Sequence, residues 1–378
     1  MKILFNSYNT TAAGTSNITK FILTALVSAD ADAGNNKLYF IVPRIDLFRE
    51  LKGTAQVKII KLPVFKGVIN FFFRGIYDIL IFPLFSFVLG TQAVVVMANY
   101  APGCLYGKKI VFMRHPYLVN GADRKGGIHK FFDIEAIRLC IFRLTLLSSN
   151  LIIVQSDYMK RRLAEKFGRV SKVRVLPNPV SNLLKIEATD AEKETGSARN
   201  VLYISRYYPH KAHWFLLQLV DKYQREFRQA GVKFYVTVAP SSKSARLFLS
   251  DLQKRGLTDI IDNIGEVSNE ELTVYYQAAR CIFFPSRFET FGNPLIEAMA
   301  FKLPAVVPDL GYAHAVCGDS GVYFQPDDID DAYQKLMALL LDDDAHRQLS
   351  IKSGHQLRHF PSVESWLKRL FALVNAEI

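Results

Sequence analysis

Two glutamates frame a glycine turn in "FFPSRFETFGNPLIEAMAFKLP", residues 283–304. Glu289 and Glu297 lie eight positions apart, with Gly292 and Asn293 between them. We expect "CIFFPS" to form a strand, "RFETFG" a loop, and "NPLIEAMA" the start of a helix that Asn293 caps. The free N–H groups and positive dipole end of such a helix suit a phosphate. A pyrophosphate bound there would have one carboxylate beside each of its ends.

A simpler interpretation of the same segment needs no ligand. Glu297 would then only complement the helix dipole, worth about 0.3 to 1 kcal/mol, and Glu289 would be a solvated loop residue. The spacing alone leaves both interpretations open.

Two cations follow an earlier predicted strand, in "VLYISRYYPHKAHWFLLQLV". Arg206 leaves the strand end and Lys211 stands five residues later, at the expected start of a helix. Both could reach one crevice and stabilise the negative charge of a departing diphosphate. As ordinary surface cations they would need no ligand, so this pair is a weak signal by itself.

The first half of the chain offers two further candidates. His115 follows a predicted strand in "MRHPYLVNGADRKGGIHK", where a side chain with a pKa near neutrality could handle an acceptor proton. Capping or packing is the commoner role of a single histidine. Gly14 lies in "NTTAAGTSN", a short loop before a predicted helix, and no GxGxxG fingerprint is present.

Short apolar runs alternate with helical patterns along the whole chain, which is typical of parallel sheets covered by helices. The predicted strands are residues 2–7, 37–43, 57–63, 93–99, 109–115 and 151–156, then 201–205, 233–239, 260–265, 281–286, 304–309 and 321–326. The polar segment at residues 181–199 is expected to be a linker. The sequence therefore predicts an α/β protein with two doubly wound domains, residues 1–180 and 200–360. Ligands of such folds bind outside the carboxyl ends of the strands.

The composition is consistent with two cores and an uneven charge. The 378 residues are 50% hydrophobic and carry a formal net charge of +12. Residues 1–180 contain 25 Lys and Arg against 10 Asp and Glu, whereas the remainder contains 22 against 25. The basic half suggests an anionic surface or substrate, although a solvated basic face kept for solubility would give the same count.

No secretory signal is expected at the start of the chain, and the four cysteines lie far apart, as in a cytoplasmic protein with reduced thiols. The uncharged segment 79–99 resembles a membrane span, but Pro83 and Gly90 interrupt it, so we predict two elements. The acidic clusters 327–331 and 342–346 are expected to cap helices, and we predict no catalytic metal.

The motif "PSRFETFGNPLIEAMA", preceded by "ISRYYPHK" and "VQSDYMKRRL...VRVLPNPV", resembles the retaining glycosyltransferases of family 4. The likeness runs from about residue 150 to 340. It implies the GT-B fold, with two Rossmann-like domains facing a central cleft and a terminal helix at residues 361–378 that packs back on the first domain. The segment "YAHAVCGDSGVYFQPDD" is similar to bacterial surface-polysaccharide transferases.

The resemblance assigns a role to each candidate. Glu297 would hold the ribose of a UDP- or GDP-linked sugar, Glu289 would contact the sugar, and Arg206 with Lys211 would neutralise the diphosphate, without a metal or another cofactor. The implied catalytic residues are Glu289, His115, Arg206 and Lys211. The implied donor-binding residues are Gly14, Arg206, Lys211, Phe291, Gly292, Asn293, Pro294, Leu295 and Glu297.

Four positions depart from the family pattern. Ser205, Ala212 and Lys302 stand where glycines are usual, and Ala315 stands where a glutamate is common. None of them removes a charged group of the implied donor site, but Ala315 puts the loop on the sugar side in doubt.

Three functions follow from these features. The first is transfer of a sugar to a lipid-linked or polysaccharide acceptor in cell-surface glycan synthesis, at the cytoplasmic face of a membrane. The segment 61–85 mixes cations with large apolar residues, so it could lie on the anionic lipid of such a membrane. An ordinary buried helix would explain the same segment. The second is epimerisation or phosphorolysis of a nucleotide sugar on the same fold. The third is a non-enzymatic protein that binds nucleic acid or a membrane surface, but no nucleic-acid module is recognisable, so we expect no nucleic-acid partner.

Overall fold

The computed structural model describes residues 1–9, 13–28, 34–65, 67–101, 105–115, 134–168, 171–180 and 199–377, which form two compact units. The first unit is Met1–Pro179 together with Pro361–Ile378, and the second is Val180–Phe360. The predicted linker lies outside the described residues, apart from Arg199, which begins a strand.

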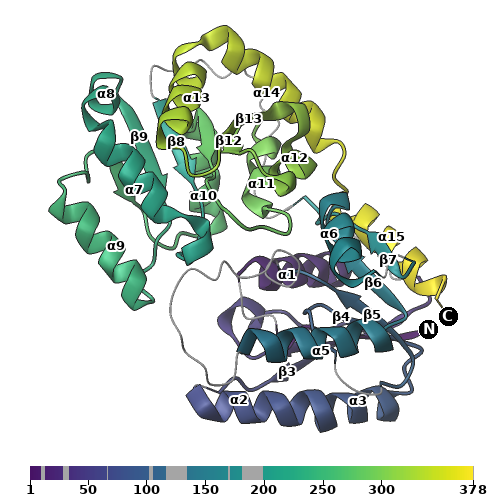
Figure 1. The fold of residues 1–378 in the computed structure, drawn as a ribbon. Coiled ribbons are helices and arrows are strands. Elements are labelled where there is room, and N and C mark those ends of the chain that lie inside the picture. Colours follow the sequence, from purple (N-terminus) through teal and green to yellow (C-terminus); the bar gives the residue numbers. More distant parts are fainter. Residues whose placement is uncertain are drawn as a thin grey trace. The chain divides into compact units, whose positions relative to one another are not determined.

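The first unit is built on a parallel sheet of seven strands in the order β3-β2-β1-β4-β5-β6-β7 (Figure 1). The strands are β1 (Lys2–Asn6), β2 (Lys37–Pro43), β3 (Val57–Leu62), β4 (Ala93–Val96), β5 (Lys108–Phe112), β6 (Leu151–Val154) and β7 (Val173–Val175). The inner strands are nearly continuous apolar runs because helices bury both faces of the sheet. The first six strands match the predicted ones to within three residues at each end.

The helices of the first unit divide between the two faces of this sheet. They are α1 (Ala13–Val27), α2 (Gly67–Ile76), a π-helical turn (Tyr77–Ile81), α3 (Phe82–Leu89), α5 (Ile134–Ser148), α6 (Asp157–Phe167) and α15 (Val363–Asn375), with a 3-10 turn at Asp46–Phe48. The last helix, α15, is far away in sequence, but its Trp366 is fully buried and stacks on Phe112 of β5 at 5.6 Å between ring centroids.

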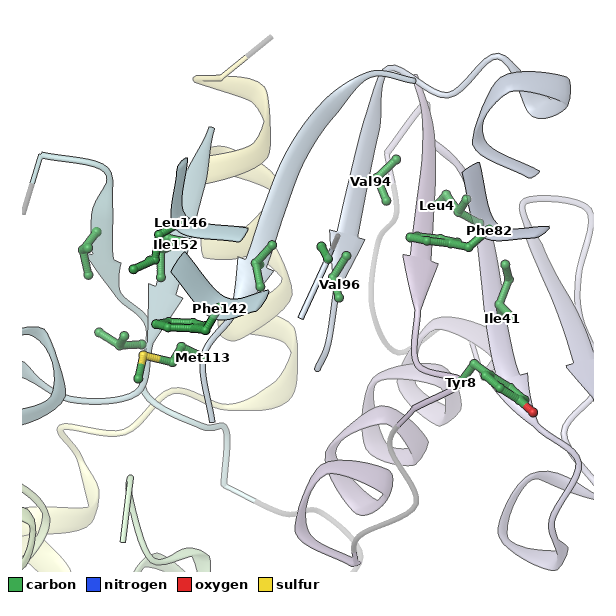
Figure 2. Packing of buried hydrophobic residues seen from close by; sticks show 14 of the residues in the cluster. Leu4, Tyr8, Ile41, Phe82, Val94, Val96, Met113, Phe142, Leu146 and Ile152 are labelled. Carbon is green, nitrogen blue, oxygen red and sulfur yellow. The ribbon is translucent and has the colours of Figure 1, made fainter. Parts of the chain in front are cut away.

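A hydrophobic core fills the face of the sheet that α2, α3 and α5 cover (Figure 2). Leu4, Val94 and Val96 contribute from the strands, and Phe82 and Phe142 from the helices. Because α3 and α5 pack on the same face, their outer surfaces point to the same side of the unit.

The uncharged segment 79–99 forms two elements, as predicted, but Pro83 does not separate them. The helix runs without a break from Gly67 to Leu89 and ends at Gly90, whose φ of 60° is left-handed. Proline in a helix removes one N–H group and crowds the carbonyl one turn earlier. The π-helical turn just before Pro83 widens the helix at that point, which explains why the proline is tolerated.

The second unit has a parallel sheet of six strands in the order β10-β9-β8-β11-β12-β13. The strands are β8 (Arg199–Tyr203), β9 (Val232–Val236), β10 (Ile261–Asn263), β11 (Cys281–Phe283), β12 (Ala305–Pro308) and β13 (Gly321–Phe324). The helices are α7 (His213–Lys222), α8 (Gln224–Gln229), α9 (Lys243–Lys254), α10 (Asn269–Ala278), α11 (Asn293–Ala300), α12 (Gly311–Cys317), α13 (Ile329–Leu341) and α14 (Asp343–Leu357), with 3-10 turns at Pro209–Lys211 and Gly318–Ser320.

The acidic clusters of the second unit cap helices, as predicted. Asp328 accepts hydrogen bonds from the backbone N–H groups of Asp330 and Asp331 at the start of α13. Asp342 ends α13 and caps α14, so the long amphipathic run is two helices. The described cysteines, Cys140, Cys281 and Cys317, are free, and Cys104 lies outside the described residues.

Candidate active site

The strand order of the second sheet reverses between β8 and β11. These two strands are adjacent and parallel, yet the chain leaves β8 toward β9 on one side and leaves β11 toward β12 on the other. The loops after such a pair separate, and the space between them is where open α/β sheets bind ligands. Lys211 follows β8 and Glu289 follows β11, so the topology brings these two predicted residues to one place.

Lys211 and Glu289 form an ion pair, with Nζ of the lysine bound to Oε1 of the glutamate. Their side chains are only 16% and 12% exposed. The Ser286 hydroxyl donates to the same carboxylate oxygen at 2.7 Å. The Tyr203 hydroxyl donates to the carbonyl of Lys211 and holds the 3-10 turn against β8. The result is a fixed, largely desolvated pair of opposite charges beside the carboxyl ends of two strands.

Two of the positions that depart from the family pattern have a left-handed backbone. Ala212 follows Lys211 with φ of 57°, and Lys302 follows the last turn of α11 with the same φ. The family 4 pattern has glycine at both positions. The left-handed φ explains this preference, because residues with a Cβ adopt that conformation at a cost of about 1 to 2 kcal/mol. Ser205, the third such position, has no positive φ.

Gly292, and not the predicted Asn293, caps α11. Gly292 has φ of 89°, Asn293 is the first helical residue, and no side chain of the cap accepts a hydrogen bond. The left-handed turn that starts the helix favours glycine, and a Cβ there would lie 3.0 Å from Leu295 Cδ1. Of the predicted donor-binding residues, Phe291 and Leu295 have buried side chains that support this turn from the core side.

Glu297 lies one turn into α11 with a partner of its own. The Tyr276 hydroxyl, on α10, donates to Glu297 Oε2 at 3.0 Å. Burial raises the pKa of Glu297, while the hydrogen bond from Tyr276 opposes that shift. The two glutamates of the motif therefore have different partners and do not share a proton.

Arg206 is not part of the Lys211–Glu289 pair. Its Nε lies 3.7 Å from Glu266 Oε1, and both side chains are about half exposed. Lys211 thus contacts Glu289 while Arg206 contacts Glu266, and that both cations reach one crevice stays a prediction.

Two predicted residues, Gly14 and His115, belong to the first unit. Gly14 lies in the first turn of α1 and not in the loop where it was predicted. His115 follows β5 and is half-buried. Its neighbour Arg114 has a buried guanidinium whose three nitrogens have no hydrogen-bond partner among the described residues, and burial lowers its pKa to about 9. The ring of Phe112 lies 4.9 Å from its Cζ.

Sequence reasoning missed three of these residues. Ser286 stands three positions before Glu289, and this short spacing was a usable signal. Tyr276 precedes Glu297 by 21 residues, and no local pattern links them. Arg114 directly precedes His115, but its burial depends on the packing around it, which no local pattern indicates.

A protein-family comparison matches most of the second unit. Residues 198–343 match the model of the family described as glycosyl transferases group 1. This range holds Lys211, Glu289 and Glu297 together with the strands and helices that position them.

Curated relatives match over shorter segments. The O-antigen chain mannosyltransferase B of Escherichia coli is 35% identical over 114 residues, which is 30% of this chain and 29% of that protein. The O-antigen chain mannosyltransferase RfbU of Salmonella typhimurium is 40% identical over 72 residues, 19% of this chain and 20% of that protein. The aligned part of the chain thus spans less than a third of the length of these two relatives.

Solved structures match over the whole chain and establish the fold. Sucrose-phosphate synthase from Thermosynechococcus elongatus has a TM-score of 0.76 at 16% identity, covering 100% of this chain and 98% of that one. Anabaena Alr3699/HepE, solved in complex with UDP and glucose, has a TM-score of 0.74 at 14% identity and covers 100% of both chains. The chain has the GT-B fold, and its residues 198–343 match the glycosyl transferases group 1 model.

Proposed function

We propose that this protein is a retaining hexosyltransferase that moves a sugar from a UDP- or GDP-linked donor to a lipid-linked or polysaccharide acceptor. The observation that carries this proposal is the desolvated Lys211–Glu289 pair at the switch point of a sheet that matches the group 1 family. The solved relative Alr3699/HepE binds UDP and glucose, which supports a nucleotide-linked donor.

Donor binding is proposed to begin at α11. Because Gly292 offers no side-chain cap, the diphosphate takes the place of a capping group at the helix start. Glu297, one turn further along, accepts hydrogen bonds from the ribose hydroxyls with the carboxylate that Tyr276 orients. Two hydroxyl donors would offset the desolvation that raises the pKa of this group.

Lys211 is proposed to act on the leaving group. As the bond from the sugar C1 to the diphosphate oxygen breaks, negative charge grows on that oxygen, and an ammonium in a water-poor site stabilises it. A new bond forms from C1 to the acceptor oxygen on the same face, and the acceptor proton passes to the departing phosphate. Glu289, released from Lys211 by the incoming phosphate, would bind sugar hydroxyls. Lys211, Arg206 and the helix dipole would meet the charge of the diphosphate without a metal.

The acceptor is proposed to bind the first unit. His115 follows β5, at the carboxyl edge where ligands of parallel sheets bind, and would position the acceptor hydroxyl. Arg114 beside it is a buried cation with no counter-charge in the part of the chain that the structure describes, which favours an anionic group such as a phosphate on the acceptor. Arg114→Met is therefore expected to raise KM for the acceptor more than it lowers kcat.

The curated relatives suggest the pathway. Both are O-antigen mannosyltransferases, so we propose that this chain extends a bacterial surface polysaccharide, at the cytoplasmic face of the membrane.

A panel of nucleotide sugars tests the proposal. Thermal unfolding would be measured with UDP- and GDP-linked glucose, galactose, mannose and N-acetylglucosamine, followed by slow donor hydrolysis in the presence of EDTA. Sugars linked to one of the two nucleotides, UDP or GDP, should raise the Tm of the protein. The protein should hydrolyse them slowly even in the presence of EDTA. Glu297→Ala should abolish the shift, whereas Glu270→Ala, an exposed glutamate in the first turn of α10, should not.

Three outcomes would contradict it. These are no stabilisation by any nucleotide sugar, an unchanged shift in Glu297→Ala, and a requirement for inorganic phosphate or an acceptor-independent change of the donor sugar. The last would assign a phosphorylase or an epimerase in place of a transferase.

A further inference from the structure

The helix from Gly67 to Leu89 carries an apolar stripe on its outer surface. Its members recur every three or four positions, and each is between 51% and 71% exposed: Ile69, Phe72, Ile76, Ile79, Leu80, Leu84, Phe87 and Val88. Among the described residues, Phe72–Leu89 is long and apolar enough to cross a membrane. Soluble monomers rarely expose so large a contiguous apolar surface without a partner.

The inner surface of the same helix is fixed to the first unit. Tyr77 and Phe82 are buried in the core, and the Tyr77 hydroxyl donates to Asn6 Oδ1 at 2.9 Å. Asn9 bonds both charged groups of the helix, accepting from Arg74 Nε at 3.0 Å and donating to Asp78 Oδ1 at 3.1 Å. A helix that crossed a bilayer would have to abandon these contacts. A helix that stays in place can only lie parallel to a membrane surface.

The apolar surface extends beyond this helix. Tyr106 is 53% exposed, and its ring meets Phe87 edge-on at 5.9 Å. Leu144 and Leu147 are exposed on α5, which covers the same face of the sheet. Tyrosine suits the level of lipid headgroups, where its ring is in apolar surroundings and its hydroxyl is wet.

The charges around this surface are positive. Among the described side chains of α2, the π-helical turn, α3 and α5, the single carboxylate is Asp78, which turns inward to Asn9 together with Arg74, and the exposed cations are Arg138 and Arg143. Lys58 alternates with Ile60 and Leu62 along β3, so it lies on the same side of the sheet, and Lys2 Nζ donates to the last carbonyl of α3. Cations beside an apolar face complement anionic lipid, at about 1 kcal/mol for each Lys or Arg near the surface.

We propose that the apolar stripe, with Tyr106, Leu144 and Leu147, is the surface by which the protein lies in the plane of an anionic bilayer. The stripe enters the boundary between headgroups and acyl chains, and the flanking cations contact the headgroups. A membrane is favoured over a protein partner because the stripe contains no polar group that would fix one orientation of a partner. This inference does not depend on the proposed transfer reaction.

Vesicle flotation of the full chain tests it, with phosphatidylglycerol and phosphatidylcholine in equal parts against phosphatidylcholine alone. We expect binding to the anionic vesicles that weakens as salt rises. The triple variant Ile79→Ser, Leu84→Ser, Phe87→Ser should bind at least about 100-fold more weakly, since each buried large side chain contributes roughly tenfold. The matched control replaces three exposed apolar residues on helices of the second unit, Val274→Ser, Leu341→Ser and Ile351→Ser, and should bind like the parent.

Depth measurement separates lying on the membrane from crossing it. Phe72 and Phe87 are 15 residues apart, about 22 Å along a helix axis. Tryptophan at either position should be quenched by brominated lipids at a similar, shallow depth.

Several results would overturn the proposal. They are no binding to either kind of vesicle, equal binding of the two, unchanged binding of the triple serine variant, and clearly different depths for Phe72→Trp and Phe87→Trp. If the parent sediments as a dimer and the triple serine variant as a monomer, the surface binds a second copy of the chain and not a membrane.

Discussion

Replacing Lys211 by methionine removes one half of the Lys211–Glu289 pair while keeping most of the volume of the side chain. Glu289 would keep only the hydrogen bond from Ser286. Because both side chains are more than four-fifths covered, the remaining carboxylate is poorly solvated. The loss of one partner of a buried pair costs 3 to 5 kcal/mol, and the residual exposure here reduces this to roughly 2 to 3 kcal/mol.

A double-mutant cycle measures the coupling of the two charges. Glu289→Gln should cost a similar amount, because it leaves the ammonium of Lys211 without a counter-charge. The double variant removes both charges, so it should cost less than the sum of the two single variants, by about 1.5 to 3 kcal/mol.

Urea unfolding of the second unit gives these energies. The chain has two tryptophans, Trp214 in the second unit and Trp366 in the first, so a Trp366→Phe background lets Trp214 fluorescence report on the second unit alone. The control is the exposed pair of Lys222 and Asp330, whose side chains are 50% and 54% exposed. Lys222→Met should change stability far less than Lys211→Met does. Additive single costs, or equal effects of the two lysine variants, would refute the reasoning.

Three further predictions concern other residues of the second unit. Tyr276→Phe should destabilise the protein by about 1.5 to 3 kcal/mol at pH 8, where Glu297 is charged and loses the hydrogen bond from the Tyr276 hydroxyl. The loss should be smaller at pH 4.5, because removing that hydrogen bond raises the pKa of Glu297 further and the protonated form depends less on it. An equal loss at both pH values would contradict this. Lys302→Gly should raise the free energy of unfolding by about 0.5 to 1 kcal/mol by relieving its left-handed φ, whereas Lys335→Gly in the middle of α13 should lower it, as chemical denaturation would show. Burial lowers the pKa of His213 to about 3, so the unfolded chain binds more protons below about pH 6.5, and stability should fall by about 2 kcal/mol from pH 7.5 to 5; a His213→Phe variant with the same pH dependence would count against this.

The sequence predicted the strands well because each is a short apolar run that two layers of helices bury. It also placed Lys211 and Glu289 after two different strands, but the pairing of their side chains follows from the strand order, which places β8 beside β11. The strand prediction needs only the periodicity of apolar residues, which is a local property of the chain.

The remaining features depend on backbone geometry or on distant partners. Asn293 was predicted as the cap of α11 from its residue type, but the turn needs a left-handed φ that favours Gly292. Pro83 was predicted to interrupt the segment 79–99, but the helix continues past it after a π-helical turn. Arg206 faces Glu266, a residue 60 positions away, and no spacing rule indicates that contact.

The central claim is that this chain transfers a sugar from a nucleotide donor with retention. The most direct measurement is an NMR time course with the donor that stabilises the protein and an acceptor glycan or its lipid-linked form. The account predicts release of the nucleoside diphosphate together with a product whose anomeric configuration is that of the donor, and both signals should be lost in Lys211→Met but not in Lys222→Met. A product of inverted configuration, or full turnover by Lys211→Met, would contradict it.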